Sequence, residues 1–301
     1  MKSKIMGLRE AVSEIPDGAE IALGGFAITR NPIAFAHELI RQGKKDLTLY
    51  EIIGAMDSDT LVGAGAVKKF SYGGGSLDRF GRIGRINEAI EKGSVDVREY
   101  SGLSISFRFL AGSLGISYIP TKTLLGTNML KNLLKKDDSV LISSSPYTGE
   151  KEVLIKALQP EYAVLHAPFA DEKGNIIIEG PVWDKEIGLA AKKLFVTVDK
   201  IVSNDYVKRN PEKVVIPSIY TYAVIEVPYG AYPTSVYKQY DYDAEMLTRY
   251  ARINKTQEEF DIFLRDYVLS TKDHNEFLEK CGGMERLMQL RADPVFGYCK
   301  N

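Results

Sequence analysis

The segment covering residues 16–32 constrains the fold more than any other stretch of this chain. An Asp-Gly turn leads into a short strand that ends at Leu23, and Gly24-Gly25 follows it directly. Asn31 then suits the N-cap of a helix, and Pro32 suits its first position. The apolar face of this helix and its glycine stop are formed by Ile33, Ala36, Leu39, Ile40 and Gly43. The sequence therefore predicts a strand, a bare glycine step and a helix.

The glycine step can serve a ligand or only the backbone. Two residues without Cβ atoms let ligand atoms approach backbone N–H groups closely at the start of a helix. Arg30 lies just outside that helix and offers a directional charge for a carboxylate or a phosphate. The same glycines also suit a tight strand-to-helix turn, and both interpretations stay open at this point. The step is not a Walker loop, because no Gly-Lys-Ser or Gly-Lys-Thr follows it.

Strands alternate with helices through the first two-thirds of the chain. Strands are predicted at 47–53, 68–72, 95–100, 161–166, 194–198 and 222–227, and helices at 57–65, 79–93 and 103–114. Such alternation is typical of an α/β fold with an open, mostly parallel sheet flanked by helices. The pattern weakens over 120–146, which we interpret as the mouth of a site or a partner contact. From about residue 244 the chain is helical and charged, so we expect one domain over 1–301 with a helical C-terminal extension.

Composition argues against several classes of function. The chain has 301 residues, of which 45% are hydrophobic and 26% charged, as in an ordinary globular protein. Its net charge of −1 gives no support for nucleic-acid binding. The two cysteines, Cys281 and Cys299, fit a reducing cytoplasm, and we see no secretion signal or membrane-spanning stretch. We therefore expect a cytoplasmic protein that binds neither nucleic acid nor membranes.

A second glycine-rich loop follows the strand predicted at 68–72. Gly73, Gly74 and Gly75 precede Ser76, and they leave its hydroxyl and several N–H groups at the carboxyl end of that strand. Ligands collect at this edge in open α/β sheets, whereas the alternative is a mobile loop without a ligand. Ser76 does not lie in a Gly-x-Ser-x-Gly motif, so we do not interpret it as a nucleophile.

No pattern in the chain marks a catalytic group or a metal site. His37, His166 and His274 are scattered, without cysteine or carboxylate at ligand spacing, so we expect no metal. His166 ends a predicted strand, and we interpret it as a hydrogen-bonded structural residue, with lining a cleft as the alternative. The carboxylates lie on predicted helix surfaces and turns, and none is marked as a buried acid or base. The chain by itself therefore offers no convincing catalytic residue.

Several of these segments together resemble the α subunit of family I CoA-transferases. The resemblance is carried by the glycine step up to Phe26, Arg30-Asn31-Pro32, the loop before Ser76, residues 165–175 and residues 228–233. The tail is similar to the glutaconate-type branch of the family at residues 240–243, 255–261 and 272–278. Many α subunits carry Gly-x-Pro where this chain has Arg30-Asn31-Pro32, and the glutaconate-type branch resembles this chain in its arginine.

The resemblance implies an open α/β fold of the CoA-transferase type and a homologous β subunit, commonly in an α2β2 assembly. The implied reaction moves CoA between an acyl-CoA and a small carboxylate or dicarboxylate such as glutaconate. Its nucleophile is a glutamate of the β subunit in a Ser-Glu-Asn-Gly motif, which this chain lacks. A covalent glutamyl-CoA intermediate forms on that partner. The CoA thioester is then a substrate, and we expect no tightly bound cofactor.

The resemblance also suggests which residues of this chain touch the substrates. The predicted contacts are Gly24, Gly25, Phe26, Arg30, Gly74, Gly75 and Ser76. The first glycine step and the phenylalanine would bring backbone and an aromatic edge near the reacting acyl group. The arginine would hold the far carboxylate of a dicarboxylic substrate, and the second loop would bond to its oxygens. This chain would thus form part of a pocket wall, while the partner supplies the catalytic residue.

Other activities are known on this fold and define the alternatives. Decarboxylases and ring-opening hydrolases of CoA thioesters are the first two. Hydrolase-like α subunits carry a glutamate shortly after the strand that here ends at Tyr100, where this chain has Ser101-Gly102-Leu103, so we rank a hydrolase lower. A decarboxylase stays open, because its decisive residue would lie on the β chain. Outside this class, the alternatives are a non-enzymatic scaffold subunit and a self-sufficient homo-oligomeric enzyme.

Overall fold

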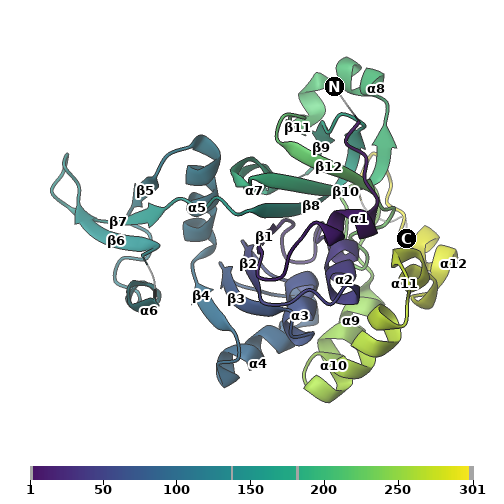
Figure 1. Ribbon diagram of the computed structural model, residues 1–301, viewed down its shortest axis with the longest axis horizontal. Helices are drawn as coiled ribbons and strands as arrows, with labels where there is room; N and C mark the ends of the chain where they lie inside the picture. Colours follow the sequence, from purple (N-terminus) through teal and green to yellow (C-terminus); the bar gives the residue numbers. More distant parts are fainter. Residues whose placement is uncertain (1–2, 137, 181–182, 298–301) are drawn as a thin grey trace.

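The computed structural model describes residues 3–136, 138–180 and 183–297 (Figure 1). Within these residues, a nine-stranded sheet contains parallel strands in the order β12-β10-β8-β1-β2-β3-β4, and β9 and β11 add an antiparallel edge beside β8. The strands of this sheet are β1 Glu20–Leu23, β2 Leu47–Glu51, β3 Val67–Tyr72, β4 Asp96–Glu99, β8 Tyr162–Asp171, β9 Ile176–Ile177, β10 Lys193–Val202, β11 Val214–Ile216 and β12 Thr221–Glu226. The predicted α/β fold with an open, mostly parallel sheet is confirmed.

Helices cover both faces of this sheet. The helices α1 to α4 pack side by side over one face together with the C-terminal helices, and α5 packs on α7 over the other (Figure 1). Side-chain alternation explains the two layers, because Ile21 and Leu23 enter the first core and Ala22 between them enters the second. The helices of these layers are α1 Leu8–Ser13, α2 Ile33–Arg41, α3 Met56–Gly63, α4 Gly84–Lys92, α5 Gly102–Leu114 and α7 Asp184–Ala190.

The start of α2 differs from the prediction by one residue. Pro32 is the N-cap and the helix begins at Ile33, so the prediction of Asn31 as the cap is wrong. The Asn31 side chain is instead drawn into the protein, where its Nδ2 donates to Asp57 Oδ1 at 3.0 Å. The predicted stop is confirmed, since Gly43 follows the end of the helix with a φ of 66°.

Residues 120–146 form more structure than their weak pattern predicts. They contain α6 Asn128–Lys136 and β6 Val140–Ser144, and β6 belongs to an antiparallel sheet in the order β5-β7-β6, with β5 Tyr118–Thr121 and β7 Lys151–Lys156. This sheet lies at the end of the molecule away from the C-terminal helices (Figure 1). Leu141 and Ile142 are 57% and 49% exposed, so β6 lacks the in-out alternation that identifies a strand. The role of residues 120–146 as the mouth of a site or as a partner contact stays a prediction.

The helical extension predicted from about residue 244 is present. It comprises α9 Ala244–Ile253, α10 Gln257–Phe263, a π-helical turn η3 Leu264–Leu269, α11 His274–Lys280 and α12 Gly283–Gln289. Asp243 caps α9 and Thr256 caps α10 through their side-chain oxygens. Tyr250 donates to Asp59 Oδ2 at 2.9 Å, which fastens α9 to α3. The extension is therefore an integral part of one hydrophobic core rather than a separate appendage.

Two buried histidines join α2 to α11, and they predict a loss of stability in acid. His37 and His274 both pack against Phe277, and burial lowers the pKa of His274 from 6.5 to about 4. As the pH falls, His274 takes up a proton in the unfolded chain before it does so in the folded chain. The free energy of unfolding is therefore highest above pH 6.5 and decreases as the pH falls towards 4. We expect protonation of His274 to lower the free energy of unfolding by up to about 3 kcal/mol. Urea unfolding across this range should show a smaller pH slope for His274→Gln than for wild type, and equal slopes would contradict the assignment.

Candidate functional site

Three loops follow neighbouring parallel strands and lie against one another at the carboxyl edge of the sheet. We name them the β1 loop (24–31), the β2 loop (52–55) and the β3 loop (73–76). The Ala27 N–H donates to Ile53 O at 3.3 Å, which joins the first two loops. The Gly54 N–H donates to Gly74 O at 2.9 Å, and Ser76 N–H donates back to Gly54 O at 3.0 Å. The two loops predicted from the sequence are thus brought together by the β2 loop, which contains none of the predicted contacts.

The two glycines of the β1 loop are required by close packing. A Cβ on Gly24 would lie 2.6 Å from Asp184 Oδ1, and a Cβ on Gly25 would lie 2.8 Å from Thr29 O. Gly25 also has a φ of 87°, which side-chain-bearing residues rarely adopt. The interpretation as a tight turn that needs small residues therefore holds in this structure. Their contact with a substrate stays a prediction.

Phe26 lies at the exposed tip of the β1 loop. Its backbone forms a two-bond bridge with Thr29, at 2.9 and 3.0 Å, which closes a tight turn. Phe26 is 43% exposed. This position leaves the ring available to a substrate or to a partner chain, as its predicted role requires.

Arg30 points into the protein and is held by Asp184, the first residue of α7. The Arg30 Nη2 and Asp184 Oδ2 atoms are 2.9 Å apart, and both side chains are 1% exposed. The other carboxylate oxygen, Asp184 Oδ1, accepts the Gly25 N–H at 2.9 Å. Arg30 also has a φ of 56°, a conformation that the surrounding contacts must hold in place. A substrate carboxylate would have to share this guanidinium with Asp184, so the predicted role of Arg30 stays a prediction.

The β3 loop presents a hydroxyl with its hydrogen available. Ser76 Oγ accepts the Asp78 N–H at 2.8 Å, and its own O–H has no acceptor among the described residues. The residue is half-buried, next to Gly74 with a φ of 135°. An O–H donor whose oxygen is held in this way can bond to a carboxylate or to a developing oxyanion. This geometry suits the contact predicted for Ser76.

His166 is a buried, hydrogen-bonded structural residue, as predicted. Its Nδ1 lies 2.9 Å from Thr197 Oγ1 and its Nε2 lies 3.4 Å from Asp199 Oδ1, and the ring is fully buried. The prediction that it ends a strand is wrong, because β8 continues to Asp171. The strand extends past the histidine because it pairs with the full length of β10.

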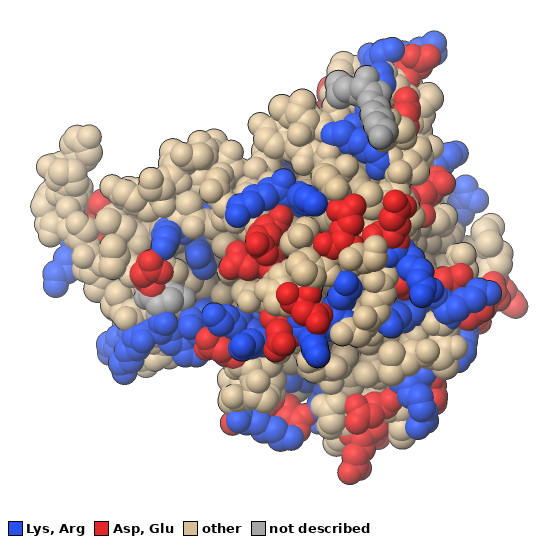
Figure 2. All heavy atoms as spheres, in the orientation of Figure 1, with Lys and Arg blue, Asp and Glu red and all other residues tan. Residues whose placement is uncertain are grey.

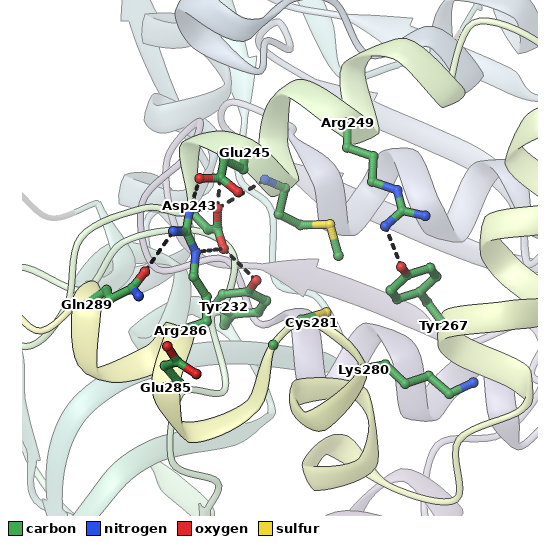
Figure 3. A pocket seen from close by; sticks show the side chains of 12 residues that line it. Tyr232, Asp243, Glu245, Arg249, Tyr267, Lys280, Cys281, Glu285, Arg286 and Gln289 are labelled. Carbon is green, nitrogen blue, oxygen red and sulfur yellow. Dashed lines mark hydrogen bonds and ion pairs between the residues drawn. The ribbon is translucent and has the colours of Figure 1, made fainter.

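A separate cavity of about 530 Å³ lies among the C-terminal helices and contains none of the predicted contacts (Figure 3). Arg286 spans it and binds Asp243 through two hydrogen bonds of 2.9 and 2.7 Å, and Tyr232 donates to the same carboxylate at 2.7 Å. Burial raises the pKa of the Cys281 thiol to about 12, so it stays protonated and unreactive at neutral pH. The Cys281 thiol is therefore not suited to act as a nucleophile in this cavity.

The charged surface does not single out another site. Acidic and basic side chains intermingle over the middle of the face in Figure 2, and a band of Lys and Arg lies near α6. In this region Arg98 and Lys136 both pair with Asp96, so part of the positive charge is neutralised.

Across the described parts of the chain, no group of three or more His, Cys, Asp or Glu side chains could hold a metal ion. None of the described helices combines the length and the apolar character needed to cross a bilayer.

Comparisons with known proteins agree with this geometry. The family model described as "Coenzyme A transferase" matches residues 5–227. One of the subunits of glutaconate CoA-transferase from Acidaminococcus fermentans is 35% identical, over 98% of this chain and 97% of that protein. A crystal structure of glutaconate coenzyme A-transferase from the same organism matches with a TM-score of 0.94 and 34% identity over 99% of both chains. A variant of the decarboxylase AibA/AibB matches with a TM-score of 0.77 and 30% identity, over 88% of this chain and 100% of that one. The chain therefore belongs to the coenzyme A transferase family.

Proposed function

We propose that this chain is the α subunit of a two-subunit CoA-transferase that moves CoA between an acyl-CoA and a small dicarboxylate such as glutaconate. The observation that carries the proposal is the TM-score of 0.94 with glutaconate coenzyme A-transferase over 99% of both chains. This similarity extends through the C-terminal extension, beyond the residues 5–227 matched by the family model. The proposal includes a homologous β subunit, in an α2β2 assembly.

In the proposed reaction the nucleophile belongs to the partner. Its glutamate attacks the thioester carbonyl, forming a mixed anhydride and CoA thiolate. The thiolate attacks the glutamyl carbonyl, which releases the first carboxylate and leaves a glutamyl-CoA thioester. The acceptor carboxylate then takes the CoA by the reverse steps. A carboxylate is a weak nucleophile in water, so the site must exclude solvent and hold donors towards the developing oxyanion.

The loops of this chain suit that supporting role. The bonded β1, β2 and β3 loops give a backbone surface that does not need to reorganise during the reaction. Ser76 supplies an O–H donor, and the exposed ring of Phe26 can help to exclude water from the acyl group. Arg30 would supply charge for the far carboxylate of a dicarboxylic substrate. Each of these contacts is part of the proposal.

The first test is dependence on the partner. We expect the purified chain alone to show no CoA transfer between acetyl-CoA and glutaconate, and the complex with the product of the adjacent open reading frame to show it. The physical reason is that this chain supplies the pocket wall and the partner supplies the nucleophile. Borohydride reduction of the acyl-CoA-loaded complex, followed by mass measurement, should modify the partner and leave this chain unchanged. Transfer by the single chain, or a covalent modification of it, would overturn the proposal.

A decarboxylase is the second candidate, because the AibA/AibB decarboxylase shares this fold at 30% identity. Release of CO2 from a dicarboxylyl-CoA by the complex, without CoA transfer, would favour the decarboxylase.

A hydrolase ranks below the transferase and the decarboxylase on a structural ground as well. Ser101 is the N-cap of α5 and accepts the Ser104 N–H at 3.1 Å, so this position is used to start a helix.

A further inference from the structure

Glu51 is a buried carboxyl group beneath the β2 loop, and it is not one of the predicted substrate contacts. It is the last residue of β2 and its side chain is fully buried. No donor among the described residues meets the geometry of a hydrogen bond at Oε1 or Oε2, although the Ser58 hydroxyl and the Asp57 carboxyl lie close enough to Glu51 to shift its pKa. Burying an ionised carboxylate without partners is very costly, and native proteins rarely leave such groups unsatisfied. The carboxyl is therefore expected to be neutral or to share a proton with a neighbour.

The neighbour that can share the proton is Asp57, in the first turn of α3. Burial and the charge of Asp57 raise the pKa of Glu51 well above its ordinary value, and burial raises the pKa of Asp57 to about 6. A hydrogen bond with Glu51 acts to lower the pKa of Asp57, and Asp57 Oδ2 has no other partner among the described residues, so Asp57 can accept an O–H from Glu51. The other groups around Glu51 are neutral: Ser58 on α3, and Tyr72, its register partner on β3, whose pKa is raised to about 12.

This pair lies where the loops of the candidate site meet. Gly54 of the β2 loop leaves room for it, because a Cβ there would lie 2.9 Å from Glu51 Oε2 and 2.8 Å from Ser58 Oγ. On the other side, Asp57 Oδ1 accepts from Asn31, the residue after Arg30. The two acids thus connect the β2 loop to the β1 loop from inside the protein. The backbone of Gly54 in turn holds the β3 loop.

We propose that Glu51 is a positioning residue of this site, whose neutral carboxyl shares a proton with Asp57 and fixes the β2 loop against the segment that carries Arg30. The inference rests on the proposed function for its activity readout only. Loss of the shared proton would place two carboxylates side by side in a buried site, and their repulsion would displace the β2 loop. Activity and stability should therefore both decline as the pH rises.

The test compares Glu51→Gln with Glu51→Ala in the complex, by kcat against pH, and in this chain alone, by thermal unfolding. Glutamine keeps the size and a hydrogen-bond donor without an ionisable proton, so it should rescue the activity that alanine loses and remove the alkaline decline of kcat. Folded wild type holds a proton that the unfolded chain releases above pH 4.5, so its stability falls as the pH rises beyond that value. The Tm of Glu51→Gln should exceed that of wild type by an amount that grows with pH.

The matched control is Glu38→Gln. Glu38 is also buried, at 5% exposure, but it is paired with Arg41 and bonded to Gln42. Its replacement should lower the Tm and leave the alkaline decline of kcat in place. The same decline in both glutamine variants would overturn the assignment to Glu51.

Three outcomes would overturn the inference in different ways. A folded Glu51→Gln protein that is inactive at every pH would show that the carboxylate itself is needed. An unchanged alkaline decline would show that another group titrates. Stabilisation of wild type, but not of Glu51→Gln, by added Na⁺ or K⁺ would show a bound cation in place of the shared proton. If the complex transfers no CoA while the unfolding results hold, the proposed function fails and the shared proton stands.

Discussion

Replacing Arg30 with methionine is expected to lower the free energy of unfolding by about 3–5 kcal/mol, because it leaves a buried carboxylate without its cation. Asp184 is 1% exposed, and its remaining described partner would be the Gly25 N–H. Urea unfolding of this chain alone measures the effect directly, without reference to any reaction. A loss below about 1 kcal/mol, the range of exposed ion pairs, would contradict the buried geometry.

The same substitution can test the predicted contact with a dicarboxylate if stability is restored. In the double variant Arg30→Met/Asp184→Asn both charges are gone, and the asparagine Oδ1 can still accept the Gly25 N–H. Neutral replacement of a buried ion pair often costs little stability. We expect this variant, in the complex, to lose turnover of dicarboxylyl-CoA at least tenfold more than that of monocarboxylyl-CoA, since a charge-assisted bond contributes about 1.5–3 kcal/mol. Equal losses would show that Arg30 serves the fold and not the substrate.

The main sheet could be predicted because its strands carry their own local signal. Ile21 and Leu23 are buried in one core and Ala22 in the other, so a short, nearly continuous apolar run marks β1. Gly24 and Gly25 then indicate a turn, and the helical spacing of the apolar residues from Ile33 onwards indicates the helix α2. By contrast, β6 has exposed apolar residues on both faces and depends on pairing with β7, which local periodicity does not record.

The polar interior could not be predicted, because it depends on contacts between distant residues. Asp184 meets Arg30 across 154 positions of sequence, and it lies in a stretch that otherwise looks like the exposed start of a helix. Glu51 lies inside the strand predicted at 47–53, and no local pattern marks its carboxyl group as buried. One available signal was missed: Gly54 follows β2 just as Gly24 and Gly74 follow their strands. Three glycine loops on adjacent parallel strands would have indicated the same edge of the sheet.

Replacing Gly25 with alanine is expected to destabilise the chain more than the same change at Gly18. Both glycines have positive φ, 87° and 76°, so both substitutions carry a backbone strain of about 1–2 kcal/mol. At Gly18 a Cβ meets nothing within 4 Å, whereas at Gly25 it would lie 2.8 Å from Thr29 O and 2.9 Å from the Arg30 backbone. These are main-chain atoms of the same tight turn, so they cannot move aside as a flexible side chain can. Overpacking of this kind adds about 1–3 kcal/mol.

Activity separates the two glycines further, because the Gly25 N–H and Arg30 are the described groups that hold Asp184. Displacing that N–H loosens the carboxylate that orients Arg30 and shifts the β1 loop against Ile53. We therefore expect Gly25→Ala to abolish CoA transfer in the complex, and Gly18→Ala, which lies in an exposed turn outside the site, to retain it. Urea unfolding of each variant and the transfer rate of each complex provide the comparison. Equal destabilisation with activity retained in both would mean that the turn can open by a few tenths of an ångström, and that the glycine step is not needed to assemble this site.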